Sequence, residues 1–270
     1  MSEMSVVPPA QVSDHTADCP VRRPRQPRVE LFGVPADPLT MDETVEAVRG
    51  FLRCGAAHQH VCLNAAKVVE LDRHPELAAT ITQCSLVSVD GQAVVWASRF
   101  LGQPVPERVA GIDLFERLLA ESADTGRRVY LLGARKDVVT DVARIATERF
   151  PGLVIAGARS GYWAPEEEAQ VVAAVAASRA DLLFVALPSP RKELFMDGWA
   201  TELGVPFRMG VGGSFDVMAG RTTRAPRWMQ QIGMEWAFRL AQEPRRMFRR
   251  YLVGNTAFVL LTLRRRWASR

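Results

Sequence analysis

The fold class of this 270-residue chain is decided by one stretch, RVYLLGARKDVVTDVARIATERFPGLVIAG, which covers residues 128–157. It contains an apolar run at 128–132, a turn at Gly133, a helical pattern over 137–150 and a second apolar run at 153–156. Two short apolar runs joined by one helix are typical of parallel strands in a sheet that is covered on both faces. We therefore predict a β-α-β unit in this stretch.

The same alternation extends outward in both directions. Further strands are predicted at 29–34, 60–63, 86–89, 182–186 and 207–211. Helices are predicted at 65–72, 75–84, 165–178 and 191–203, around 94–96, and after a capping box of Thr40 and Glu43. The pattern predicts an α/β fold, a Rossmann-like and mostly parallel sheet with helices on both faces. Ligands of such sheets bind at the carboxyl ends of the strands, which here carry Asn64, Asp90, Gly133, Pro188 and Gly212.

Composition divides the chain into three parts. Residues 1–28 are rich in Pro, Arg and Ser without a period, and we expect a disordered arm. Residues 29–222 carry the α/β pattern. Residues 223–270 contain three predicted helices, at 226–233, 234–242 and 244–263, with no strands between them. The last part is therefore expected to be a helical appendage to the α/β domain.

The appendage is strongly basic, although the whole chain has a formal net charge of only +4. From Arg221 to Arg270 there are twelve Arg, no Lys and two acids. Aromatic residues lie among the arginines, a combination that suits an anionic lipid surface or nucleic acid, while a solvated basic face is the simpler alternative. No apolar run reaches the roughly 18–20 residues of a spanning helix, and no apolar signal-peptide region is seen near the N-terminus.

Two features could carry chemistry. Asp90 follows a strand and precedes Gly91, so its carboxylate could be a general base or the N-cap of the next helix. Residues 210–216, GVGGSFD, form a glycine-rich turn after a strand, which would let backbone N–H groups approach a diphosphate. His58 and His60 have no partner at zinc spacing, so no metal site is predicted.

Several motifs in order resemble those of the WecG/TagA/CpsF glycosyltransferases. The matching stretch runs from about residue 30 to residue 252. Its motifs are NAAKV at 64–68, VDG at 89–91, ERVAGID at 107–113, VYLLG at 129–133, GY at 161–162, LPSPRKE at 187–193, GVGGSFDVMAGR at 210–221, RAP at 224–226 and EWAFRLAQEPRR at 235–246.

The resemblance implies an inverting glycosyltransferase that needs no metal or other cofactor. It would move a sugar, N-acetylmannosamine or a related hexose or uronic acid, from a UDP-sugar to a polyprenyl-diphosphate-linked saccharide for a cell-surface polysaccharide. The enzyme would be cytoplasmic and peripheral at the inner face of the membrane, where the basic appendage docks. A homo-oligomer is also among the expected partners, and nucleic acid is not.

The same resemblance implies roles for individual residues. Asp90 matches the base of the family, while Asn64 and Arg108 line its pocket. The appendage residues Arg239, Arg246 and Arg249 are expected to reach the active site and the acceptor diphosphate. The remaining expected substrate-binding residues are Cys62, Asp113, Gly133, Lys192, Glu193, Gly212, Gly213, Asp216 and Arg221. Cys62 and Lys192 stand where the family often has Thr and Gln, which puts the donor sugar in question.

One alternative of another class is a non-catalytic α/β module that binds a nucleotide or nucleic acid through the basic appendage. A nicotinamide enzyme is disfavoured because no GxGxxG opens a β-α-β unit near the N-terminus. Stabilisation by UDP but not by oligonucleotides would favour the transferase.

Overall fold

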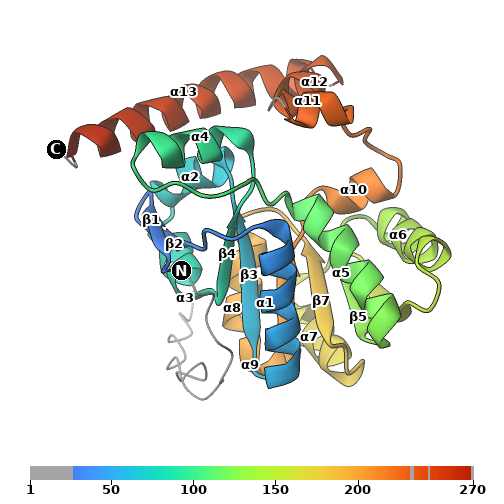
Figure 1. Cartoon of the computed structure of the whole chain (residues 1–270). Coiled ribbons are helices and arrows are strands. Elements are labelled where there is room, and N and C mark those ends of the chain that lie inside the picture. The colour runs from blue at the N-terminus through green and yellow to red at the C-terminus, as the bar shows by residue number, and fades with distance from the viewer. Residues whose placement is uncertain (1–26, 232–233, 243, 269–270) are drawn as a thin grey trace, which may run out of the picture.

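A computed structural model of the chain contains a six-stranded parallel sheet in the strand order β4-β3-β8-β7-β5-β6 (Figure 1). The structure describes residues 27–231, 234–242 and 244–268, without the side chains of 227, 231, 239 and 244–253. The predicted arm at 1–28 therefore lies almost wholly outside the described residues. The strands are β3 (His58–Leu63), β4 (Leu86–Val89), β5 (Arg128–Gly133), β6 (Val154–Arg159), β7 (Leu182–Ala186) and β8 (Phe207–Gly210).

The central strands bury side chains on both faces of this sheet. In β7, Phe184 packs with the core on one face, and its neighbours Leu183 and Val185 pack with the core on the other. Successive side chains of a strand point to opposite faces, so a strand covered on both sides must be apolar throughout. This explains the continuous apolar runs of the sequence and confirms the predicted fold class.

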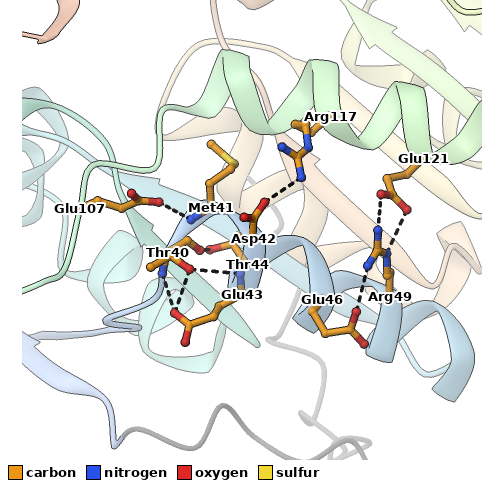
Figure 2. Close-up of polar contacts among 10 residues, drawn as sticks. All are labelled: Thr40, Met41, Asp42, Glu43, Thr44, Glu46, Arg49, Glu107, Arg117 and Glu121. Carbon is orange, nitrogen blue, oxygen red and sulfur yellow. Dashed lines mark hydrogen bonds and ion pairs between the residues drawn. The ribbon is translucent and has the colours of Figure 1, made fainter.

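Helices cover both faces of the sheet. One face carries α1 (Met41–Cys54), α5 (Gly111–Thr125) and α6 (Lys136–Arg149), and the other carries α7 (Glu168–Ala177), α8 (Arg191–Gly198) and α9 (Ala200–Leu203). A third core lies around α2 (Ala65–Leu71), α3 (Pro75–Gln83) and α4 (Gln92–Phe100). The predicted capping box of α1 is present, with the Thr40 hydroxyl and the Glu43 carboxylate each accepting the other's backbone N–H (Figure 2).

Several elements differ from the sequence prediction. The strand expected at 29–34 is a small antiparallel hairpin of β1 (Val29–Leu31) and β2 (Val34–Ala36), because Phe32 and Gly33 both have positive φ and turn the chain. The helix expected at 191–203 is interrupted at Trp199, whose φ and ψ are not helical. The helices α5 and α10 (Ser214–Met218) were not among the predicted elements.

The C-terminal region consists of α10 (Ser214–Met218), α11 (Arg227–Gln231), α12 (Glu235–Gln242) and α13 (Pro244–Ala268). Figure 1 shows α13 passing over α4 and α2, on the side of the sheet where the strands end. Phe258 of α13 is buried against Phe32 of the hairpin turn, with ring centroids 5.5 Å apart. The C-terminal half of α13 is therefore packed onto the α/β domain.

Candidate active site

The strand order creates a switch point at the carboxyl ends of β5 and β7. After β5 the chain passes to β6 on one side, and after β7 it passes to β8 on the other. Ligands of open α/β sheets bind at such points. Gly133 ends β5 there with φ of 127°, and a Cβ on it would lie 2.4 Å from the Ala186 carbonyl oxygen. Only glycine fits, so the predicted site residue Gly133 has a clear structural reason.

An exposed aromatic ring stands at the same edge. Gly161 donates its N–H to the Ala134 carbonyl at 2.8 Å and packs directly against Gly133. The next residue, Tyr162, is 76% exposed. Its loop is thus fixed to the end of β5 while its ring faces solvent. The sequence signal for this residue was only its place in the GY motif, and no role was assigned to it.

The ends of β3 and β4 bring three of the predicted residues together. The Asp90 N–H donates to the Leu63 carbonyl at 2.9 Å, so Asp90 and Asn64 follow paired strand ends. A Cβ on Gly111 would lie 3.0 Å from the Cys62 sulfur and 3.7 Å from Asp90 Oδ2. Cys62, Asn64 and Asp90 therefore belong to one small region at the carboxyl edge.

Asn64 and Asp90 also have local structural roles. Asn64 caps α2, accepting the Lys67 N–H through Oδ1 at 2.9 Å. Asp90 Oδ2 accepts the N–H of Gly111, the first residue of α5, at 3.3 Å. The helix α4 that directly follows Asp90 is preceded by Gly91 and has no side-chain cap. Asp90 thus caps a helix, but one twenty residues further along the chain than the sequence suggested.

Burial makes the Cys62 thiol a poor nucleophile. Desolvation, and after it the negative charge of Asp90, raise the pKa of Cys62 to about 12. A thiol with such a pKa stays protonated at neutral pH, and the thiolate is the reactive form. The positive charges of Lys67 and Lys192 act in the opposite direction on this pKa and do not outweigh the burial.

The segment 107–113 connects this region to the rest of the molecule. Glu107 accepts the Met41 N–H at 2.5 Å and so fixes the segment to the start of α1 (Figure 2). The Val109 N–H donates to the Val89 carbonyl at 2.9 Å, directly beside Asp90. Arg108, between these two anchors, lies 3.2 Å from the Glu235 carboxylate of α12. The predicted pocket residue Arg108 is therefore held by a residue of the appendage.

A second ion pair joins the α/β domain to the C-terminal region. Asp113 in the first turn of α5 accepts two hydrogen bonds from the Arg224 guanidinium, at 2.5 and 2.8 Å. This pair and its hydrogen bonds raise the pKa of Arg224. Asp113, expected to bind substrate, is thus engaged by the segment that leads into α11. No signal in the sequence indicates that Glu235 pairs with Arg108 or that Arg224 pairs with Asp113.

Lys192 and Glu193 form a buried cluster with Lys67. The Lys67 ammonium donates to Glu193 Oε1, and the Lys192 ammonium lies 3.0 Å from the same oxygen. Burial and the charge of Lys67 lower the pKa of Lys192. Burial acts to raise the pKa of Glu193, yet the two ammonium groups outweigh it and the pKa lies below its ordinary value. Lys67 was missed as a site residue, because a lysine inside a helix carries no signal of burial.

The glycine-rich turn after β8 lies open. A Cβ on Gly212 or Gly213 would meet no atom within 4 Å, so the turn leaves room beside its backbone. Asp216 follows in α10 and its carbonyl accepts the N–H groups of Arg221 and Thr222. The Arg221 side chain points to α6, where it pairs with Asp141 at 2.8 Å and Asp137 at 3.5 Å. The structure does not bring Arg221 to Asp90.

Three of the predicted site residues have side chains that lie outside the described part of the chain. They are Arg239, Arg246 and Arg249. Within the described ranges, no three or more His, Cys, Asp or Glu side chains gather in a metal-binding arrangement. In the same ranges, no helix combines the length and apolar character needed to cross a membrane.

The fold thus places a carboxylate among polar groups at the carboxyl edge of a parallel sheet, where α/β proteins bind their ligands. The chain matches the model of the glycosyl transferase WecG/TagA/CpsF family over residues 29–270. It is 33% identical over 200 residues, 74% of this chain and 76% of the other, to the N-acetylglucosaminyldiphosphoundecaprenol N-acetyl-beta-D-mannosaminyltransferase of Bacillus spizizenii. The chain belongs to this family of glycosyltransferases, as its motifs had indicated, and the relationship supports a role in polysaccharide biosynthesis.

Proposed function

We propose that the protein is an inverting transferase that moves a sugar from a UDP-sugar to a polyprenyl-diphosphate-linked saccharide. The sugar is of the N-acetylmannosamine type or a related hexose or uronic acid. The supporting observation is the Asp90 carboxylate at the carboxyl edge of the sheet, beside Asn64 and Cys62 and linked through the 107–113 segment to the appendage. The relative from Bacillus spizizenii carries a lipid-linked acceptor and an N-acetylmannosaminyl group in its name.

In the proposed mechanism Asp90 is the general base. It takes the proton from an acceptor hydroxyl while that oxygen forms a bond to the anomeric carbon of the donor. The bond from this carbon to the diphosphate breaks, and UDP leaves with the electron pair. Backbone N–H groups at Gly212 and Gly213 and appendage arginines offset the growing negative charge, as preorganised donors do in other transferases.

The proposed function assigns a separate task to each of two parts of the chain. Residues 29–222 form the catalytic domain, and 223–270 form the appendage that completes the site through Arg239, Arg246 and Arg249. The Arg108–Glu235 and Asp113–Arg224 pairs support a fixed position of the appendage beside the catalytic edge. Exposed apolar residues near the arginines of α13 support docking at the inner face of the cell membrane.

A transfer assay with the full chain tests this function. A panel of UDP-sugars is incubated with a synthetic lipid-diphosphate-linked GlcNAc acceptor, and products are identified by mass spectrometry. We expect one added sugar with inverted anomeric configuration, no dependence on divalent metal, and a higher melting temperature with UDP. Stabilisation by oligonucleotides instead, with no sugar transferred, would support the alternative of a non-catalytic nucleic-acid-binding module.

A further inference from the structure

A stripe of polar side chains runs along the paired strands β3 and β4 and leads to Asp90. Alternate residues of a strand point to the same face, so His60 and Cys62 of β3 share one face of the sheet. Ser88 is the direct neighbour of Cys62 on β4, and Asp90 follows it by two residues. His60 is fully buried and Ser88 is 2% exposed. Buried polar groups cost free energy unless they are hydrogen-bonded, so the bonds of this polar stripe determine whether it is stable.

The hydrogen bonds of the stripe run in one direction, from His60 to Cys62. The Ser88 hydroxyl donates to the Cys62 sulfur at 3.5 Å. A hydroxyl has one hydrogen, so the 2.9 Å contact between His60 Nε2 and Ser88 Oγ is a bond that the imidazole donates. His60 Nδ1 is then the unprotonated nitrogen, and it has no partner among the described residues. The reverse direction would leave a buried N–H unpaired, which folded proteins avoid.

The sulfur at the end of this chain rests against the residue that contacts the proposed base. A Cβ on Gly111 would lie 3.0 Å from the Cys62 sulfur, so the two groups are in close contact. The Gly111 N–H donates to Asp90 Oδ2 at 3.3 Å, at the long end of the N–H···O range. A small shift of Gly111 would therefore weaken this bond and change the orientation of the carboxylate.

We propose that Ser88 and His60 are positioning residues of the transfer reaction, which hold the Cys62 sulfur against Gly111 so that its N–H orients the Asp90 carboxylate. None of the groups between His60 and Gly111 needs to touch a substrate for this task. The inference rests on the proposed function, in which Asp90 is the base, and it adds the residues that aim this base.

A substitution at Gly111 tests the contact with the sulfur. Gly111 begins α5 without a positive φ, so its backbone is compatible with alanine. The added methyl group would press on the sulfur and displace the N–H from Asp90, so kcat should fall about 10- to 100-fold. KM for the UDP-sugar should change by less than about twofold, because the methyl group alters aim and not binding.

Removing the sulfur should reverse this loss. In Gly111→Ala with Cys62→Ala the new methyl group takes the space of the sulfur, and the double variant should be more active than Gly111→Ala alone. A double variant that is no more active than Gly111→Ala would overturn the proposal.

Ser88→Ala tests the chain behind the sulfur. It should lower kcat about 10- to 100-fold, and in the Cys62→Ala background it should have no further effect, because Ser88 acts through the sulfur. The matched control is Ser85→Ala, since Ser85 makes the same kind of contact, at 2.9 Å, with His58 at the other end of β3. The control should keep the wild-type kcat. Equal kcat values in Ser88→Ala and Ser85→Ala would overturn the proposal, and if Ser88→Ala does not fold, the Gly111 variants decide.

A measurement without transfer separates this inference from the proposed function. In the ¹H–¹⁵N NMR spectrum of the full chain, Ser88→Ala should move the Gly111 amide resonance more than Ser85→Ala does. An equal or smaller movement overturns the inference and leaves the transferase intact. Absence of transfer from every UDP-sugar by the wild-type chain overturns the proposed function, whereas the Gly111 resonance still reports on the positioning of Asp90.

Discussion

At Asp90 one carboxylate has two tasks, since it accepts the Gly111 N–H at the start of α5 and is the proposed base. Substitution can separate them. Asp90→Asn keeps an oxygen acceptor for the N–H but cannot take a proton, so kcat should fall by about 10²–10⁴ with little change in stability. Asp90→Ala loses the cap too, and its free energy of unfolding should fall by about 1 kcal/mol.

The matched control for these variants is Asp124→Asn, an exposed carboxylate at the other end of α5. It should keep wild-type turnover. Initial rates of sugar transfer and urea unfolding curves are compared between the three variants and the wild type. Full activity in Asp90→Asn would show that Asp90 is not the base, and Asp216 would then be the next candidate.

His58 and His60 make stability depend on pH. Burial lowers the pKa of His58 to about 4 and of His60 to about 3. Both values lie below the ordinary value near 6.5, so the unfolded chain takes up protons first as pH falls. The contribution of the two neutral histidines to the free energy of unfolding is therefore present above about pH 6.5 and is lost progressively as pH falls from about 6.5 to the folded-state pKa values of about 4 and about 3. From pH 7 to pH 5 the loss should reach about 4 kcal/mol.

Urea unfolding at a series of pH values measures this loss. His60→Gln should remove close to half of it, whereas His74→Gln should not, because His74 lies beside Glu76 at the surface. An unfolding free energy that is constant from pH 7 to pH 5 would show that these histidines are not held neutral in the fold.

At the scale of elements, α5 is tied to the C-terminal region by the Asp113–Arg224 pair. Reversing either charge leaves a partly buried charge beside a like charge, so the melting temperature should fall. The same change should displace α12 with Glu235, so sugar transfer should fall about tenfold. Reversing both, Asp113→Arg with Arg224→Asp, should restore much of the activity. The reversal of Arg149 and Glu116, an exposed pair between α6 and α5, is the control and should leave transfer unchanged.

This swap also decides what Asp113 does. If Asp113 binds substrate, as its motif implied, the double reversal stays as inactive as Asp113→Arg alone. Rescue would assign Asp113 to the attachment of the appendage.

Local patterns allowed most elements to be predicted, because strands such as 182–186 are apolar on both faces and Thr40 with Glu43 forms a capping box from adjacent residues. The hairpin and the break at Trp199 were not predicted because they depend on backbone angles, which hydrophobic periodicity does not encode. In the site, Asp90 and Asn64 were predictable from strand ends. The partners of Arg108, Asp113 and Glu193 were not, since Glu235, Arg224 and Lys67 meet them only through tertiary packing.

At the scale of the whole molecule, two helices far apart in sequence, α4 and α13, each expose large apolar side chains. Trp96 and Phe100 of α4 are 55% and 48% exposed, and Leu260 of α13 is 50% exposed. The Arg266 guanidinium lies 5.7 Å from the centre of the Phe100 ring, which brings the basic end of α13 to α4. The proposed lipid-linked acceptor would require the enzyme to work at a membrane, and apolar groups with adjacent arginines bind anionic interfaces.

We therefore expect the full chain to bind vesicles that contain phosphatidylglycerol and to bind neutral vesicles much less. Each basic residue near the surface contributes about 1 kcal/mol, which added salt screens, so binding should weaken steeply above physiological ionic strength.

Trp96→Glu combined with Leu260→Glu should reduce sedimentation with these vesicles at least about tenfold. Val154→Glu, an equal change on the exposed edge strand β6, should not. Because both altered side chains are exposed to solvent, transfer to a short, water-soluble acceptor should survive in the double variant. Loss of that soluble activity, or unchanged vesicle binding, would show that this surface is not where the enzyme meets the membrane.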